Sequence, residues 1–595
     1  MQEQKKSWKN GVDFVLYAPQ ADGSTAQCKH CQKKFKNQRS AYEHKNHCSA
    51  LKTAAERQVS IKQYLSKNIA GNHTKLQKIV RYICTSATSI NSATDQTFID
   101  LIEEGHSYEE IRQGILDYAD EVKKETQKKI AFATISLVMD GATIIQSGWY
   151  CIAVATNRHV YYYGCYHLAD TTTRAISKQV NTVIDEITNI THACVIGACT
   201  DNASNISNVF DPDCPDSLNV LYKKHILRVP CQAHTANLVL SSYERLSPSF
   251  SRLRSRIRAY ARHLREQDKQ ELFGITSRCP PIREQRWFTD YDALKWIITN
   301  ETKLQNAHKN QFDIIGSRTC PITKSWHKLY EALKPLAVYT WSIEADVMPL
   351  STAYMEFVNM KADLERLSSN NNHAKNMLNI VKARWSSTAD ENLMKLAFFT
   401  KRYNLITWRA NYDLACRKAA LPWKTQEDID KCQSMQKELD QMITTTQEYA
   451  IFMGFDLSNA HDEISFTLRH AKPPHTRDGQ DFWVSLSICG PNTSDQSKRI
   501  NGQELQIEQL HKVAEFYHNI ECLPASEAYC ERVFKNMREL FDISRMSAND
   551  DLIAAQTLVR MSIRMERKER NDIDDIFDDV YPEGDPGSMD EDSDD

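Results

Sequence analysis

The stretch Ala131-Phe-Ala-Thr-Ile-Ser-Leu-Val-Met-Asp140 decides the fold class of this chain. Residues 131–139 form a continuous apolar run with β-branched members, which is typical of a strand buried on both faces of a sheet. Two more strands are predicted over 149–156 and 160–168, a helix over 172–187, and a fourth strand over 193–199. Three strands, a helix and a further strand in quick succession favour an α/β layer built on a mixed sheet.

The pattern changes on both sides of this layer, which we place in residues 130–289. Residues 51–129 carry apolar side chains at helical spacing, and 290–504 form a long helical block in which strand signals nearly vanish. Residues 505–565 are again helical. We expect a separate module over 1–50 and an acidic, disordered tail over 566–595.

The composition is that of an ordinary globular protein. The chain has 595 residues, of which 41% are apolar and 25% charged, and this length allows three or four domains. The apolar runs are far shorter than the roughly 18–20 residues that a membrane span needs, and the polar start predicts no secretory signal. Seventeen cysteines without disulfide-scaffold spacing favour a reducing, intracellular setting.

The formal net charge of −3 hides an uneven distribution. Residues 571–595 hold ten Asp and two Glu without any Lys or Arg, which leaves 65 acidic against 74 basic residues elsewhere, or about +9. A basic body with an acidic tail suggests a polyanionic partner and a tail that competes with it for the same surface. Charge alone favours the plainer interpretation, a solvating tail on a mildly basic protein.

The N-terminal module contains potential zinc ligands. Two residues separate Cys28 from Cys31, while His44 and Cys48 stand four apart and would share a helix face. Two such pairs can complete a tetrahedral zinc site. A module with so few large apolar residues needs a crosslink of this kind, such as a bound metal ion, to fold. His47 is an alternative fourth ligand, and chance spacing of free cysteines is the alternative to any zinc site.

Two acidic residues end predicted strands. Asp140 follows the first strand, and Asp201 closes the run that begins at Ala193. Because neighbouring buried strands end close together, two carboxylates there would repel each other, and divalent cations would relieve the repulsion. Hard oxygen ligands suit Mg²⁺, and two such ions support phosphodiester cleavage. An acid at a strand end is more often a turn or helix cap, however, and residues 202–205 fit that interpretation too.

Two shorter motifs are further candidates. Cys231 and His234 form a CxxH pair, for which we expect an orienting or structural role because no second pair follows at zinc spacing. Arg286 and Trp287 adjoin the helical block, where a tryptophan beside an arginine can stack on an unpaired base. A lone tryptophan is more often part of the core.

The stretch Pro524-Ala-Ser-Glu527-Ala-Tyr-Cys-Glu531-Arg-Val-Phe534 predicts the start of a helix. An apolar stripe would dock this helix onto another layer, with Glu527 and Glu531 one turn apart at its edge. Either carboxylate could lean into a metal site beneath, and the spacing does not choose between them.

The order of these motifs resembles the hAT superfamily of cut-and-paste DNA transposases with an N-terminal BED-type zinc finger. The finger matches in Cys28, Cys31, His44 and Cys48, preceded by the aromatic Trp8 and Phe14. The catalytic domain matches in "MDGAT" at Asp140, "TDNASN" at Asp201, "CQAH" at Cys231 and "RW" at Arg286. The C-terminal dimerisation region matches in "PASEAYCERVF", so the resemblance covers the chain except for its tail.

The resemblance implies an RNase H-like catalytic domain, beginning in 130–289 and ending in 505–565, interrupted by 290–504 as an all-α insertion. The family's Asp-Asp-Glu triad maps onto Asp140, Asp201 and Glu531, because its glutamate directly precedes "RVF", and these residues would hold Mg²⁺ or Mn²⁺ beside structural Zn²⁺ in the finger. His234 would contribute near the active site. Arg286 and Trp287 would meet a flipped base next to the transposon end.

The implied activity is that of a nuclear transposase without a membrane partner. A homodimer or larger oligomer, with 51–129 as a helical DNA-binding or dimerisation region, would bind double-stranded terminal inverted repeats. It would cut the DNA, leave a hairpin on the flanking DNA, and join the freed ends to target DNA. The departures from the family pattern, Ala142, Gln285 and "FKNM" after "RV", are peripheral to the metal chemistry.

Two other functions compete with this one. A domesticated descendant would keep the finger and the dimer interface and regulate transcription or chromatin without catalysis. An RNase H-like nuclease acting on RNA–DNA hybrids would explain neither the finger nor the insertion. The presence of all three triad acids favours the active transposase over the regulator.

Overall fold

The computed structural model describes residues 14–16, 26–28, 34–35, 74–86, 89–94, 98–99, 105–144, 147–266, 275, 277–282, 288–310, 320–345, 348–387, 390–400, 402–470, 497–500, 503–544 and 550–580. The chain divides into two compact units. The first comprises residues 1–119 and 540–548, and the second comprises 120–539 and 549–595.

The first unit contains a small antiparallel sheet and helices. The strands β1 (Phe14–Leu16), β2 (Ala26–Cys28) and β3 (Lys34–Phe35) pair in that order, and α3 (Lys75–Ser86), α4 (Ile90–Ala93) and the start of α6 (Tyr108–Lys129) follow. Cys28 ends β2, but its side chain and the residues Cys31, His44, His47 and Cys48 lie outside the described part. The zinc site therefore stays a prediction.

The second unit is built on a five-stranded mixed sheet. Its strands are β4 (Thr134–Ile144), β5 (Ser147–Ala155), β6 (Val160–Leu168), β7 (Cys194–Thr200) and β8 (Leu227–Pro230), in the spatial order β6-β5-β4-β7-β8. The first three form an antiparallel meander, whereas β7 and β8 run parallel to β4. The predicted α/β layer is confirmed. β8 was not predicted, because four residues ending in proline give a weak strand signal.

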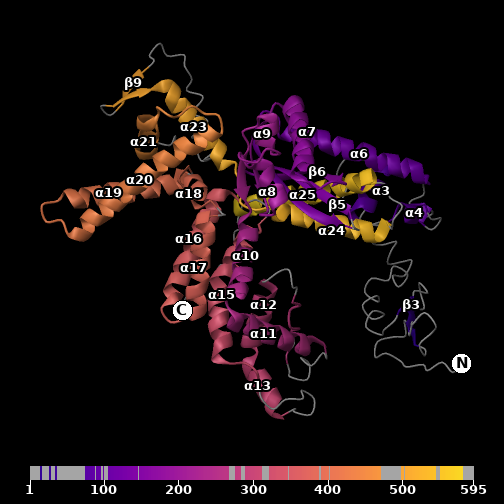
Figure 1. The fold of residues 1–595 in the computed structure, drawn as a ribbon. Helices are drawn as coiled ribbons and strands as arrows, with labels where there is room; N and C mark the ends of the chain where they lie inside the picture. The colour runs from indigo at the N-terminus through magenta and orange to yellow at the C-terminus, as the bar shows by residue number, and fades with distance from the viewer. Residues whose placement is uncertain are drawn as a thin grey trace, which may run out of the picture. The chain divides into compact units, whose positions relative to one another are not determined.

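Side chains that alternate along β4 divide the sheet into two faces. Leu137 and Met139 face α7 (Thr173–Thr191) and share a core with its buried side. Val138 and Asp140 point to the opposite face, where α24 (Ala528–Ser544) lies and the Cys530 thiol donates to the Val138 carbonyl oxygen at 3.3 Å. Figure 1 shows α7 and α24 on opposite sides of the strands. The helix that carries Glu531 therefore covers the face to which Asp140 points.

A block of helices continues the core of this unit. One cluster of buried apolar side chains runs from the sheet through these helices, and in Figure 1 α19 and α20 extend from the block as a hairpin. Among the described helices, none has the length and hydropathy that a bilayer crossing requires. The helices are α10 (Gln232–Leu246), α11 (Pro248–Glu266), α12 (Phe288–Thr299), α13 (Glu301–Asn310), α15 (Lys324–Ile343), α16 (Leu350–Ser368), α17 (Asn372–Ser387), α18 (Glu391–Thr400), α19 (Arg402–Ala420), α20 (Gln426–Phe452), α21 (His461–His470) and α23 (Ile507–Glu521).

The helical block extends beyond the predicted range of 290–504. Its core already includes α10 and α11, and it still includes α23. A short antiparallel hairpin of β9 (Ser497–Ile500) and β10 (Gln503–Gln506) interrupts the helices before α23. Helical periodicity shows that a segment buries one face, but it does not show in which core that face is buried.

Short helices join the parallel strands, and a long helix ends the described chain. α8 (Ser204–Ser207), η1 (Asn208–Phe210) and α9 (Leu218–Tyr222) connect β7 to β8, while α25 (Asp550–Val580) packs against β6. The predicted start of a disordered tail at residue 566 is wrong, because α25 continues to Val580. Ile573, Ile576 and Phe577 recur at helical spacing, and this pattern continues the helix among the acidic residues.

The segment that precedes α24 is fixed to several other elements. The Ala525 N–H donates to the Met348 carbonyl oxygen and the Gln232 N–H donates to the Ala525 carbonyl oxygen, each at 2.9 Å. Leu523 packs so closely on β7 that a Cβ atom added at Gly197 would lie 2.5 Å from its Cδ2. These contacts fix the start of α24 and hence the place of Glu531 over the sheet.

Gly197→Ala is expected to lower the free energy of unfolding by about 1–3 kcal/mol, because the added methyl group would overlap Leu523 and crowd the Leu227 carbonyl oxygen. Urea denaturation measures the loss. The double variant Gly197→Ala/Leu523→Ala should lose less than the sum of the single variants, because removing the Leu523 side chain relieves the overlap. Fully additive losses would contradict the close docking of this segment on β7.

Candidate active site

Asp140 and Asp201 lie at the same level of the sheet. The prediction that Asp140 ends its strand is wrong, because β4 continues to Ile144, whereas Asp201 does follow the end of β7. In the parallel pair of β4 and β7, Met139 lies opposite Thr200. The next residues of the two segments, Asp140 and Asp201, therefore lie beside each other. Neighbouring strands are about 4.8 Å apart, and paired residues point to the same face. The structure thus brings Asp140 and Asp201 together at one edge of the sheet, on the α24 side.

Helices α24 and α10 add two more of the predicted residues. Glu531 of α24 and His234 of α10 line, together with Asp140, a cavity of about 520 Å³. The other lining residues are Gly141, Ala142, Asn237, Leu238, Ser241, Glu244, Arg254, Arg258, Phe534 and Arg538. Three positions that are remote in the sequence therefore meet at one polar cavity.

The acids at this cavity influence one another electrostatically. The pKa of Asp140 is raised to about 7, first by burial and then by the negative charges of Asp201 and Glu531. The Gly141 N–H and the positive charge of Arg538 oppose this rise. Carboxylates that repel one another in a partly buried site favour a cation between them.

In the described part of the chain, no three His, Cys, Asp or Glu side chains are grouped as a metal-binding cluster. Two of the acids form local hydrogen bonds: Asp140 Oδ1 accepts from the Gly141 N–H at 2.7 Å, and Asp201 Oδ1 accepts from the Ala203 N–H at 3.1 Å. For Asp201 this is the turn-forming alternative. The residue types nevertheless fit Mg²⁺ or Mn²⁺, which prefer carboxylate oxygen ligands.

The loop that carries Asp201 is held by residues of β8 and α10. Arg228 donates to the Asp201 carbonyl oxygen at 2.7 Å and to Asn202 Oδ1 at 2.9 Å. The Asn202 amide in turn donates to Thr235 Oγ1 at 3.1 Å. Sequence reasoning missed Arg228, because no motif marks a residue whose role depends only on the pairing of β8 with β7.

The CxxH motif begins α10 in an orienting role. Cys231 is the N-cap, and its Sγ accepts a hydrogen bond from the His234 N–H at 3.4 Å. The pKa of His234 is lowered, chiefly by burial, while the charges of Asp201 and Glu531 oppose the shift. A histidine whose pKa is lowered in this way is suited to accept a proton.

The structure distinguishes the two glutamates that spacing left open. Glu527 is 4% exposed, and its Oε2 has no hydrogen-bond partner in the part of the chain that the structure describes. Burial together with nearby negative groups raises its pKa well above the ordinary value. Glu531 is only partly buried and lines the cavity. Glu531 is thus the glutamate that a ligand in the cavity can reach.

The other predicted site residues are not described. Gln285, Arg286 and Trp287 lie outside the described ranges, so stacking on a flipped base stays a prediction. No protein-family model matches the sequence, and no curated protein matches it. The roles of the site residues therefore rest on the chain's own sequence and geometry.

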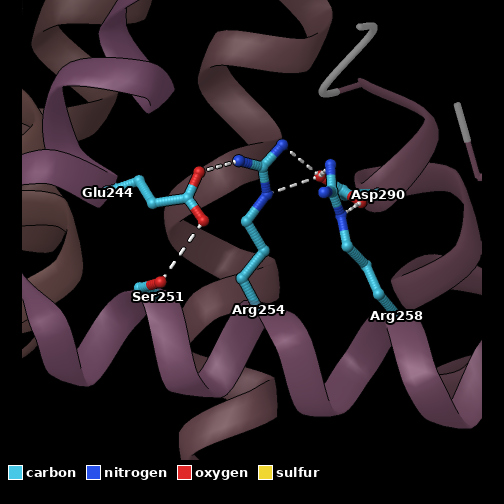
Figure 2. A network of polar contacts seen from close by, with 5 residues as sticks. All are labelled: Glu244, Ser251, Arg254, Arg258 and Asp290. Atoms are coloured by element: carbon cyan, nitrogen blue, oxygen red, sulfur yellow. Dashed lines mark hydrogen bonds and ion pairs between the residues drawn. The ribbon is translucent and has the colours of Figure 1, made fainter. Parts of the chain in front are cut away.

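A network of ion pairs forms the α11 side of the cavity, as Figure 2 shows. Arg254 pairs with Glu244 of α10 and, at 2.6 Å, with Asp290 in the first turn of α12. Arg258 donates to both oxygens of Asp290, at 2.6 and 2.9 Å. Because Asp290 is 5% exposed, one buried carboxylate holds two arginines and ties α11 to α12.

Asp290→Asn is expected to destabilise the protein by about 3–5 kcal/mol, because it leaves two partly buried guanidinium groups without their shared counter-charge. Asp292→Asn is the matched control, since Asp292 lies in the same helix and forms no ion pair within the described residues. Urea denaturation of both variants measures the difference. Equal stability of the two variants would show that the network contributes nothing to the fold.

Asp140→Asn is expected to stabilise the cation-free protein at neutral pH. The folded-state pKa of about 7 exceeds the ordinary value of 3.8, so the folded chain binds this proton more tightly than the unfolded chain. Stability from this group is present at low pH and is lost as the pH rises through about 4 to 7. The asparagine avoids that loss, on the order of 1–4 kcal/mol.

The measurement is urea denaturation in chelator at pH 8 and pH 4. The gain from Asp140→Asn should be present at pH 8 and nearly absent at pH 4, whereas Asp120→Asn, at an exposed position of α6, should show no such gain. A gain that is the same at both pH values would contradict the raised pKa.

Proposed function

We propose that this chain is a DDE-type DNA transposase of the hAT superfamily that cuts and joins phosphodiester bonds in double-stranded DNA. The observation that carries the proposal is the meeting of Asp140, Asp201 and Glu531, which stand far apart in the sequence, on one face of one sheet. Each of the three also stands in a sequence motif that resembles the family's motif for that acid.

The sheet supports the same proposal. An antiparallel meander followed by two parallel strands, in the order β6-β5-β4-β7-β8, is compatible with an RNase H-like domain. The first acid stands on the central strand β4 and the second follows the adjacent strand β7. The helical block between α10 and α23 then corresponds to the family's insertion, because it separates the sheet strands from α24 in the sequence.

The three carboxylates would hold two Mg²⁺ or Mn²⁺ ions, which supply activation of water and stabilisation of the leaving oxygen when bound. Side chains of the protein would supply proton transfer and hold the acids in position. His234, at the wall of the cavity, can hold or move a proton beside the reacting phosphate. Arg228 fixes the Asp201 loop, and Glu527 remains buried beneath the site.

The partners belong to the same proposal. Terminal inverted repeats and target DNA would be bound by the zinc finger (Cys28, Cys31, His44 and Cys48) and by the basic surface of the chain, mostly through phosphate contacts that weaken with salt. The protein would act in the nucleus as a homodimer or a larger oligomer. The alternative remains a domesticated DNA-binding regulator, and the orientation of Asp140 and Asp201 toward backbone amides is the observation in its favour.

Asp201→Asn and Glu531→Gln are each expected to lower DNA cleavage at least about 100-fold while DNA binding stays unchanged, because each removes a ligand that acts only on the chemical step. The substrate is a plasmid that carries the genomic DNA flanking the coding sequence, incubated with Mg²⁺ or Mn²⁺. Asp213→Asn, at an exposed position of the β7–β8 connection, is the control that should still cut.

Cation binding gives a readout that is independent of cleavage. Mn²⁺ at about 100 times its dissociation constant should stabilise the wild-type protein by about 2.7 kcal/mol, and it should stabilise the Asp201→Asn variant much less. Binding of the flanking DNA without any cleavage by the wild-type protein would favour the regulator. Cleavage by the Asp201→Asn variant would show that the site is misassigned.

A further inference from the structure

Arg538 has a position that the proposed cleavage chemistry does not explain. It stands seven residues after Glu531 on α24, so two turns of helix separate the two side chains on one face. Both line the cavity, with Phe534 between them. Arg538 is exposed, and within the described residues it forms no hydrogen bond or ion pair.

The opposite wall of the cavity repeats this spacing. His234, Asn237 and Ser241 of α10 stand three and then four residues apart and all line the cavity, as Glu531, Phe534 and Arg538 do on α24. The cavity therefore extends from the acids along two helices, and Arg538 lies about 10 Å of helix rise beyond Glu531. A nucleic-acid strand covers such a distance in a few nucleotides.

Two features of the cavity indicate a polar ligand. Asn237 Oδ1 is buried and has no hydrogen-bond partner among the described residues, although a buried acceptor is normally satisfied. The arginines of the α11 wall are already engaged by Glu244 and Asp290, whereas Arg538 forms no ion pair within the described residues and acts on Asp140 only through its charge. Of the three arginines that line the cavity, Arg538 is thus the one best able to bind an incoming anion.

We propose that this cavity is a subsite for a DNA strand, in which Arg538 binds a backbone phosphate a few nucleotides from the bond that is cut. A guanidinium group suits this task because it can donate two parallel hydrogen bonds to one phosphate. Its positive charge also offsets the repulsion between the acidic cluster and a polyanion. The identity of the polymer as DNA rests on the proposed function.

The test compares Arg538→Gln with Lys535→Gln. Lys535 is an exposed residue of the same helix that carries the same charge but does not line the cavity. Binding is measured over a range of KCl concentrations with a fluorescent 40-base-pair duplex (about four helical turns) taken from the flanking DNA. Loss of one phosphate contact should lower the slope of log K against log[KCl] by about 1 in Arg538→Gln.

The cleavage assay gives the second readout. Arg538→Gln should cut about 10–100 times more slowly than the wild-type protein, because a misplaced strand reacts less often, and Lys535→Gln should cut at the wild-type rate. Arg538→Lys should restore the salt slope but only part of the rate, since an ammonium group lacks the planar fork. The urea midpoint should change little in all three variants, because both replaced side chains are exposed.

The outcomes separate this inference from the proposed function. If the wild-type protein cuts and Arg538→Gln cuts equally fast with an unchanged salt slope, the subsite is overturned while the transposase stands. If the wild-type protein binds DNA without cutting it and Arg538→Gln still lowers the salt slope, the phosphate contact is supported and the proposed catalytic function is contradicted. Equal effects of Arg538→Gln and Lys535→Gln on the salt slope and the cleavage rate would show that Arg538 acts only as one of many surface charges, and would overturn the proposal.

Discussion

The mutual repulsion of Asp140, Asp201 and Glu531 is the constraint on which the rest of the site depends. The parallel register of β4 and β7 places the first two acids side by side, and the docking of α24 adds the third. A fold that holds three carboxylates together in a partly buried place loses stability unless protons or cations neutralise them. Burial, and after it the negative charges of Asp201 and Glu531, raise the pKa of Asp140. Divalent cations bound between the three carboxylates would remove this loss of stability.

The elements around the acids hold them in place from several directions. Leu523 on Gly197 and the hydrogen bonds of Ala525 fix the start of α24, while Arg228 fixes the loop after Asp201. The pairs that join Arg254 and Arg258 to Asp290 hold the α11 side of the cavity. Because the sheet and the helices share one buried core, the helical block supports the site rather than standing apart from it. The helical block therefore supplies walls to the candidate site without supplying its acids.

Sequence alone predicted the part of this arrangement that local chemistry determines. The apolar run before Asp140 predicted a buried strand, and the two acids were expected to lie close together, as the register places them, although Asp140 lies within β4 and not at its end. Spacing did not separate Glu531 from Glu527, because the two stand one turn apart at the edge of the predicted helix; in the structure Glu527 precedes α24 and is buried. Arg228 and Arg538 were missed because their neighbours come from distant segments. The range of the helical block was also misjudged, since periodicity does not identify the core that a helix joins.

The central claim is that the three carboxylates form one cation site when the protein binds DNA and metal. The most direct measurement is a crystal structure of the protein with Mn²⁺ and duplex DNA, with the metal located by its anomalous scattering. The account predicts metal peaks between the carboxylates of Asp140, Asp201 and Glu531, with the first two turned away from the amides of Gly141 and Ala203. A structure with DNA bound, no metal peak at the acids and both of those hydrogen bonds intact would contradict it.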